Sequence, residues 1–137
     1  MPDPSIDAAL AHHHVGNLLY GYTDVADRKD VDAGVALLGH ATVRFPTDGF
    51  DRPQDARPFL ERLWGDDVPH RHDVTNLVVE PAGPGLWRAR AHYARHVLAP
   101  DPVLTTLGEY DLLVHEPDAD GHAWDVRELT VHRTWSR

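Results

Sequence analysis

Length, composition and charge limit the kinds of protein that this chain can be. Its 137 residues are the length of one domain, and we expect a single domain over residues 1–137. The formal net charge of −9 argues against nucleic acids and anionic membranes as partners, because both bind basic surfaces. The chain has no cysteine, which excludes disulfides, thiolate catalysis and cysteine-type zinc sites, and a cytoplasmic location is expected.

The first half of the chain predicts three helices. Apolar residues recur every three or four positions over residues 6–27, and Ser5 is placed to cap this long helix. A polar break follows, and residues 31–38 predict a second, short helix that ends near Gly39. A third helix is expected over residues 54–64, where several apolar side chains lie near the end of the segment.

The remaining segments predict strands joined by loops and tight turns. A short strand at residues 41–46 ends at a proline, and a loop follows at residues 47–53. Four longer strands are expected over residues 72–80, 86–98, 105–115 and 124–135. Helices that precede a run of strands predict an antiparallel sheet with the helices packed on one face, which is an α+β fold.

Several short motifs follow one another along these expected elements. In chain order they are Tyr22 with the Asp27-x-x-Asp30 step, the opening His72-x-x-x-Asn76, the alternating segment 89–97, Gly108-x-Tyr110, and Trp124 after the turn at Gly121. In this order and spacing they resemble the SnoaL-like branch of the NTF2-like superfamily over residues 6–135. One departure is His40, because many relatives carry an aspartate just before the first strand.

The resemblance implies a cone-shaped fold with a central pocket. N-terminal helices would pack on a curved, mainly antiparallel sheet and enclose a site for a small molecule. Members of this superfamily include polyketide cyclases, dehydratases such as scytalone dehydratase, ketosteroid isomerase, epoxide hydrolases and non-catalytic subunits. The fold therefore does not select one reaction.

Three residues are the candidate catalytic groups. His72 opens a strand, and its imidazole titrates near neutrality, which suits proton transfer. The resemblance implies the same role, since scytalone dehydratase has a catalytic histidine at the matching place and an aspartate that matches Asp27. Tyr22 fits the tyrosine of the family, and its phenol could donate a hydrogen bond to a carbonyl oxygen. The alternatives are a core histidine, a helix-end aspartate and a core tyrosine.

A second group of residues is expected to contact substrate. These residues are Asn76, Asp24, His92, His96, Tyr110 and Trp64. Asn76 shares the face of His72 if the strand alternates regularly, and Asp24 lies one helical turn before Asp27. His92 and His96 share one face of the expected strand, and the alternative is that the opposite face, with Tyr93, Arg95 and Val97, lines the pocket.

Metals and cofactors are not expected. The chain has 11 histidines, and His70 and His72 have a spacing that suits a metal, but no HExxH motif, cysteine ligand or facial pair with a downstream acid accompanies them. No glycine-rich phosphate loop and no nucleophile elbow is present.

These observations favour a cofactor-independent enzyme that uses acid–base chemistry. It would catalyse dehydration, isomerisation or aldol-type cyclisation of a small, apolar, oxygenated substrate, in secondary metabolism. The alternative is a non-catalytic ligand-binding or structural subunit, similar to the small subunit of ring-hydroxylating dioxygenases. Epoxide opening is a third possibility with less support. A homodimer is expected through the open face of the sheet, which would expose either Trp87 and Tyr93 or a row of Arg88, Arg90 and His92.

Overall fold

The computed structural model describes residues 3–137, which form helices and one mixed sheet. The elements in chain order are α1 (Pro4–Arg28), α2 (Val31–Leu38), β1 (Thr42–Arg44), β2 (Gly49–Phe50), α3 (Pro53–Leu63), β3 (His70–Gly83), β4 (Leu86–Val97), β5 (Val103–His115) and β6 (Asp125–Ser136). None of the described helices is both long and apolar enough to cross a bilayer.

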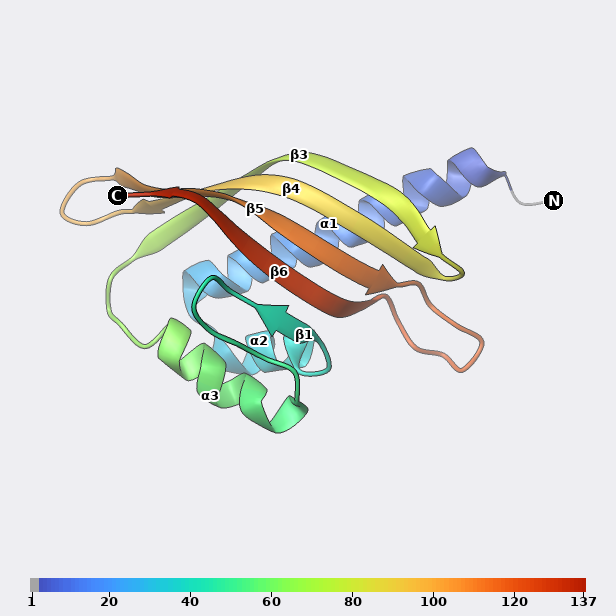
Figure 1. Ribbon diagram of the computed structural model, residues 1–137, viewed down its shortest axis with the longest axis horizontal. Coiled ribbons are helices and arrows are strands. Elements are labelled where there is room, and N and C mark those ends of the chain that lie inside the picture. The colour runs from blue at the N-terminus through green and yellow to red at the C-terminus, as the bar shows by residue number, and fades with distance from the viewer. Residues whose placement is uncertain (1–2) are drawn as a thin grey trace.

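The strands form one sheet in the order β2-β1-β6-β5-β4-β3. All neighbouring pairs are antiparallel except β1 and β6, which run parallel. Figure 1 shows α1 crossing one face of the long curved strands, while α2 and α3 lie beside β1 on the same side of the sheet. The expected α+β architecture, with helices on one face of a mainly antiparallel sheet, is confirmed.

The long helix begins earlier than the sequence pattern predicts. Asp3, not Ser5, is the N-cap of α1, and its carboxylate accepts a hydrogen bond of 2.9 Å from the backbone N–H of Ser5. Pro4 can then take the first helical position, because the N–H that proline lacks has no partner there. The prediction of Ser5 as the cap is therefore wrong.

Two other boundaries differ from the predictions and matter for the site. The expected loop at residues 47–53 contains β2, which pairs with β1 at the edge of the sheet. Strand β3 begins at His70 rather than His72, so both histidines lie on the same strand. Because side chains alternate along a strand, these two imidazoles point to the same face.

The core lies between α1 and the inner face of the sheet. Along β4, the buried side chains are Trp87, Ala89, Ala91 and Tyr93. The residues between them on the same strand, Arg88, Arg90 and His92, point to the opposite face, because side chains alternate in a strand. The sequence left open whether the aromatic or the basic side chains of this strand face outward, and the structure shows that the basic ones do.

Gly108 allows the aromatic core to pack closely. A Cβ at this position would overlap the carbonyl oxygen of His132 and would lie 2.5 Å from Cε1 of the Tyr93 ring. Backbone and a stacked ring cannot both move away, so the site has no room for a larger residue. Gly21 in α1 is the contrasting case, because a Cβ there would meet nothing within 4 Å.

We expect Gly108→Ala to destabilise the fold by about 1–3 kcal/mol, the usual effect of overpacking. Gly21→Ala is the matched control and should raise the free energy of unfolding by up to about 1 kcal/mol, because alanine is a better helix former. Urea unfolding of both variants measures the two effects. Equal stability of wild type and Gly108→Ala would contradict the close packing described above.

Candidate active site

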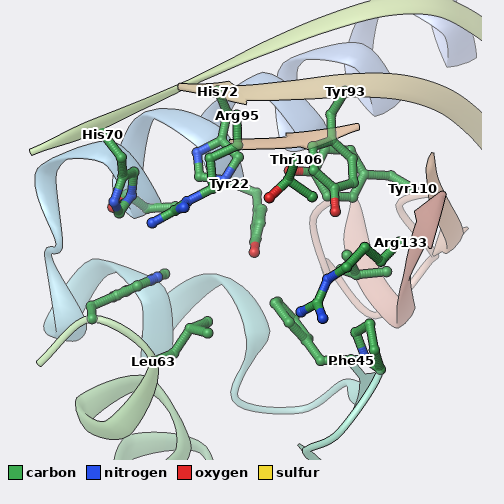
Figure 2. A pocket seen from close by; sticks show the side chains of 14 residues that line it. Tyr22, Phe45, Leu63, His70, His72, Tyr93, Arg95, Thr106, Tyr110 and Arg133 are labelled. Atoms are coloured by element: carbon green, nitrogen blue, oxygen red, sulfur yellow. The ribbon is translucent and has the colours of Figure 1, made fainter. Parts of the chain in front are cut away.

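A cavity of about 190 Å³ opens between the helices and the inner face of the sheet. Its walls come from the end of α1, the region after α3, and the inward side chains of β3, β4, β5 and β6 (Figure 2). The cavity is several times larger than the space of about 30 Å³ that one water takes up in the liquid. It can therefore hold a small organic molecule.

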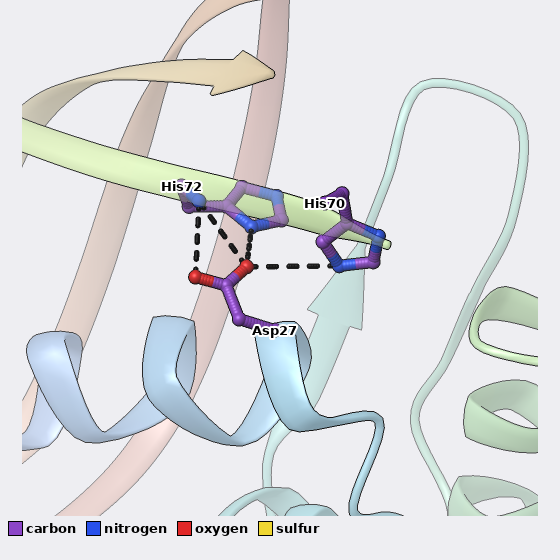
Figure 3. A group of neighbouring side chains, drawn as sticks. All are labelled: Asp27, His70 and His72. Atoms are coloured by element: carbon purple, nitrogen blue, oxygen red, sulfur yellow. Dashed lines mark hydrogen bonds and ion pairs between the residues drawn. The ribbon is translucent and has the colours of Figure 1, made fainter. Parts of the chain in front are cut away.

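Asp27 and His72 form a hydrogen-bonded pair at this cavity. The imidazole Nδ1 of His72 lies 2.6 Å from Oδ1 of Asp27, and the backbone N–H of His72 donates to both carboxylate oxygens at 3.0–3.1 Å (Figure 3). A carboxylate accepts hydrogen bonds, so Nδ1 carries the proton in the neutral ring. The second ring nitrogen, Nε2, is then an acceptor on a side chain that lines the cavity.

The protonation state of His72 results from opposing effects. Burial lowers the pKa of His72 below its ordinary value of 6.5, because a charged imidazole loses its hydration. The hydrogen bond and the negative charge of Asp27 raise the same pKa, and the positive charge of Arg95 lowers it. Burial is the largest of these effects, so at neutral pH the ring is uncharged and its Nε2 can accept a proton.

His70 supports the pair from one side. It is buried, its Nε2 lies 3.1 Å from the carbonyl oxygen of Ala26 and 3.6 Å from Oδ1 of Asp27, and its ring meets that of His72 edge to face. Burial lowers the pKa of His70, and the neighbouring charge of a protonated His72 lowers it further. His70 therefore stays neutral and can donate its Nε2 proton to the helix carbonyl.

The same three side chains offer a set of metal-ligand atoms. One ligand atom from each of Asp27, His70 and His72 lies within 4.8 Å of the others. A two-histidine, one-carboxylate set could meet a metal ion. However, the 2.6 Å bond between Asp27 and His72 already joins two of these ligand atoms directly. The arrangement therefore fits a hydrogen-bonded acid–base pair without further rearrangement.

Three tyrosines form the wall next to the histidines. The rings of Tyr93 and Tyr110 stack with centroids 4.4 Å apart, and Tyr22 meets Tyr110 edge to face at 5.7 Å. Burial raises the pKa of each of these phenols and is the largest effect on it. Each hydroxyl therefore keeps its proton and can serve as a hydrogen-bond donor. Figure 2 shows the Tyr22 side chain pointing into the middle of the cavity.

The structure brings only part of the predicted site together. His72, Tyr22, Tyr110 and Trp64 line the cavity, and Asp27 contacts it through His72. Their chemical roles stay predictions. Two residues that line the cavity, Thr106 and Arg133, were not among the candidates named from the sequence. Arg133 shares the alternation of the inward-facing residues 129 and 131, so the strand pattern carried a signal for it.

Four predicted substrate contacts lie elsewhere. Asp24 is exposed and pairs with Arg28 on the outside of α1. Asn76 is exposed at a bulge of β3, where its φ of 58° and a register shift break the alternation that began at His72. His92 and His96 point to the other face of the sheet, so the cavity receives Tyr93 and Arg95 instead. The structure therefore does not place these four residues at the cavity.

Known proteins resemble this chain in structure but not in sequence. No family model matches the chain, and no curated protein sequence does either. Similar solved structures include a variant of Rv3472 from Mycobacterium tuberculosis, a protein of unknown function, with a TM-score of 0.80 and 15% identity over 96% of this chain and 76% of that one. A provisionally assigned scytalone dehydratase from Novosphingobium aromaticivorans has a TM-score of 0.76 and 14% identity, over 96% and 90% of the two chains.

A third similar structure is a subunit of a larger assembly. The β subunit of a provisionally assigned aromatic-ring-hydroxylating dioxygenase from Novosphingobium aromaticivorans has a TM-score of 0.78 and 12% identity, over 95% of this chain and 93% of that one. Identities this low show the fold alone. The chain has the NTF2-like fold that its motifs predict, and its chemistry has to be argued from the cavity.

The buried neutral histidines predict a pH-dependent stability. Because the pKa values of His70 and His72 are lowered in the folded state, the unfolded chain binds more protons below about pH 6.5. The free energy of unfolding should therefore fall as the pH is lowered from about 7.5 to about 5.5. In His70→Gln, which keeps a donor for the Ala26 carbonyl, the fall should be smaller.

Urea unfolding at a series of pH values measures this effect. His92→Gln removes an exposed histidine of the outer sheet face and serves as the control, because it should keep the wild-type pH dependence. If His70→Gln and wild type lose stability equally on acidification, His70 is not held neutral by burial.

Proposed function

We propose that the chain is a cofactor-independent lyase or isomerase in which His72 is the general base. The observation that carries the proposal is the 2.6 Å hydrogen bond between Nδ1 of His72 and Asp27, which leaves Nε2 unprotonated on a ring that lines the cavity. A base whose pKa lies near or below neutrality is ready to accept a proton at physiological pH. The substrate is a small, mostly apolar molecule with polar groups.

The proposed reaction begins with removal of a proton from carbon. Nε2 of His72 takes a C–H proton beside an electron-withdrawing group of the substrate, and the electron pair moves toward an oxygen of that group. Asp27 stabilises the imidazolium that forms. The hydroxyl of Tyr22 donates a hydrogen bond to the developing oxyanion. In a dehydration, the electron pair then returns from that oxygen and forms a C=C bond while the bond from a neighbouring carbon to its hydroxyl breaks, and the imidazolium gives its proton to this hydroxyl, which leaves as water. In an isomerisation, the pair returns to another carbon of the conjugated system, and that carbon takes the proton from the imidazolium.

The likeness to a scytalone dehydratase supports this class of reaction, and the likeness to a dioxygenase β subunit supports a second candidate. In that alternative the chain is a non-catalytic subunit or a ligand carrier. A purely structural subunit has no need of an unprotonated imidazole facing a cavity, with a carboxylate bound to its other nitrogen. The enzyme proposal is favoured for that reason, and kinetics separate the two.

Replacing His72 by Ala should lower turnover by about 100-fold or more, the usual effect of losing an acid–base group. 5-Nitrobenzisoxazole is a suitable probe, because a single proton abstraction opens its ring and releases a coloured phenolate. Asp27→Asn should lower turnover less than His72→Ala does, because asparagine keeps the shape of the side chain and loses only its charge. The double variant should be little worse than His72→Ala, because the two residues act as one unit.

The control for this series is His92→Ala, which removes an imidazole from the outer face of the same sheet and should turn over like wild type. Melting temperatures on the same preparations separate a lost base from a lost fold. If His72→Ala melts at a lower temperature but its folded fraction opens the probe at the wild-type rate, the base has been assigned wrongly.

We also propose that the chain forms a homodimer through the outer face of the sheet. Val78, Leu107 and Trp135 leave 47%, 41% and 45% of their surface exposed. The helices cover only the inner face, so these apolar groups have no intramolecular cover (Figure 1). Light scattering at micromolar concentration should give twice the chain mass of 15.3 kDa. A mass equal to that of one chain would contradict the proposal.

A further inference from the structure

We infer that the cavity binds its substrate through a carboxylate group, with Arg95 on β4 as the main contact and Arg133 on β6 adding positive charge from another part of the wall. The substrate class is then a small carboxylic acid with an apolar body. This inference rests on the proposed function only in taking the same cavity as the substrate site, and it concerns binding rather than the proton transfer.

The first observation is the charge balance of the arginines. The chain carries 22 acidic against 13 basic residues, and most of its arginines lie within 4 Å of a carboxylate, as Arg88 does with Asp111 at 2.6 Å. Within residues 3–137, neither Arg95 nor Arg133 has such a partner. The one side-chain hydrogen bond of Arg95 is to the neutral hydroxyl of Thr105, at 3.1 Å. Arg44 and Arg137 also lack a carboxylate partner among residues 3–137, but of these four arginines only Arg95 and Arg133 line the cavity.

The second observation is the direction of these two side chains. Arg95 follows the inward alternation of Tyr93 on β4 and is half-buried. Arg133 lies two residues after the inward-facing Val131 on β6 and is exposed. Both line the cavity, and Figure 2 shows both guanidinium groups pointing into it, Arg95 near the two histidines and Arg133 near Phe45. Their charges act on a common wall, since both lower the pKa of Tyr93.

The third observation is the bond that fixes Arg95. Its Nη1 donates to the hydroxyl of Thr105, and that hydroxyl donates in turn to the carbonyl oxygen of Arg95 itself. One edge of the guanidinium is thereby anchored to the neighbouring strand, and its remaining N–H groups are available to a ligand. An anchored guanidinium loses less conformational freedom when it binds an anion.

The chemistry of the walls selects the ligand class. A guanidinium presents parallel N–H donors that match the two oxygens of a carboxylate. The side chains of Phe45, Leu63 and Trp64 make the rest of the cavity apolar, which suits a hydrocarbon or aromatic body. Positive charge beside the substrate also favours proton removal from a carbon next to the carboxylate, because negative charge builds up there.

Benzoate and benzamide form the matched pair of probes that tests the inference. They have the same size and differ in charge, and their binding can be followed by calorimetry or by the fluorescence of Trp64, which lines the cavity. Benzoate should bind wild type at least about 10-fold more tightly than benzamide, the range expected for charged hydrogen bonds. Arg95→Gln should remove most of this difference and Arg133→Gln should reduce it, and each variant should weaken benzoate binding more than benzamide binding.

Two further variants make the outcome decisive. Arg90→Gln removes an arginine from the outer face of the same strand and should bind benzoate like wild type. Arg95→Lys keeps the positive charge but loses the parallel N–H donors of the guanidinium, so it should bind benzoate with intermediate affinity. This variant tests the inference if Arg95→Gln fails to fold. Benzoate affinity no higher than that of benzamide, or unchanged in folded Arg95→Gln, overturns the inference.

The same experiment separates this inference from the proposed reaction. His72→Ala should still prefer benzoate over benzamide, because the arginines remain. If the protein binds benzoate no more tightly than benzamide but His72→Ala loses turnover, the proposed carboxylate site is wrong and the proposed base is supported. If benzoate binding depends on Arg95 but His72→Ala keeps full turnover, the carboxylate site stands and the base is wrong.

Discussion

The contact between Asp27 and β3 is the interaction on which the site depends. Asp27 is near the end of α1, and it accepts hydrogen bonds from both the backbone N–H and the imidazole of His72. One carboxylate thus joins the helix to the sheet and also sets the tautomer of the ring. A change in the position of α1 on the sheet would therefore alter the chemistry of His72 as well as the packing.

Opposing effects on the pKa of His72 keep its ring neutral, as its proposed role as a base requires. Burial and Arg95 lower the pKa of His72, while Asp27 raises it, and the net result is a neutral ring. The same cavity contains protonated phenols on one side and two guanidinium groups without carboxylate partners. A neutral imidazole, phenol donors and positive charge therefore face one small space, a combination that suits the proposed abstraction of a proton from a carbon acid.

Much of the architecture could be predicted from the sequence, because helical and strand periodicities differ and the turns are well marked. The pairing of His72 with Asp27 came from the resemblance and from residue type, and both residues do meet at the cavity. Positions that depend on strand parity were harder to predict. The bulge of β3 moves Asn76 out of phase, and either face of β4 could have been inward until the core was known.

The arginines of the cavity illustrate a second limit. Sequence alone shows how many charges a chain has, but not which ones lack a partner. Arg95 and Arg88 are both on β4, yet Arg88 meets Asp111 on the outer face, while Arg95 meets no carboxylate of residues 3–137 on the inner one. That difference depends on the register between β4 and β5, which only the folded sheet defines.

The ring nitrogens of His72 provide the most direct test of this account. Nitrogen-15 NMR of the imidazole should show the proton on Nδ1 at neutral pH and a titration midpoint below 6.5. In Asp27→Asn the midpoint should fall further, because the carboxylate raises the pKa of His72 in wild type. A proton on Nε2, or a midpoint that is above 6.5 or does not change in Asp27→Asn, would contradict the claim that Asp27 holds His72 as a free base.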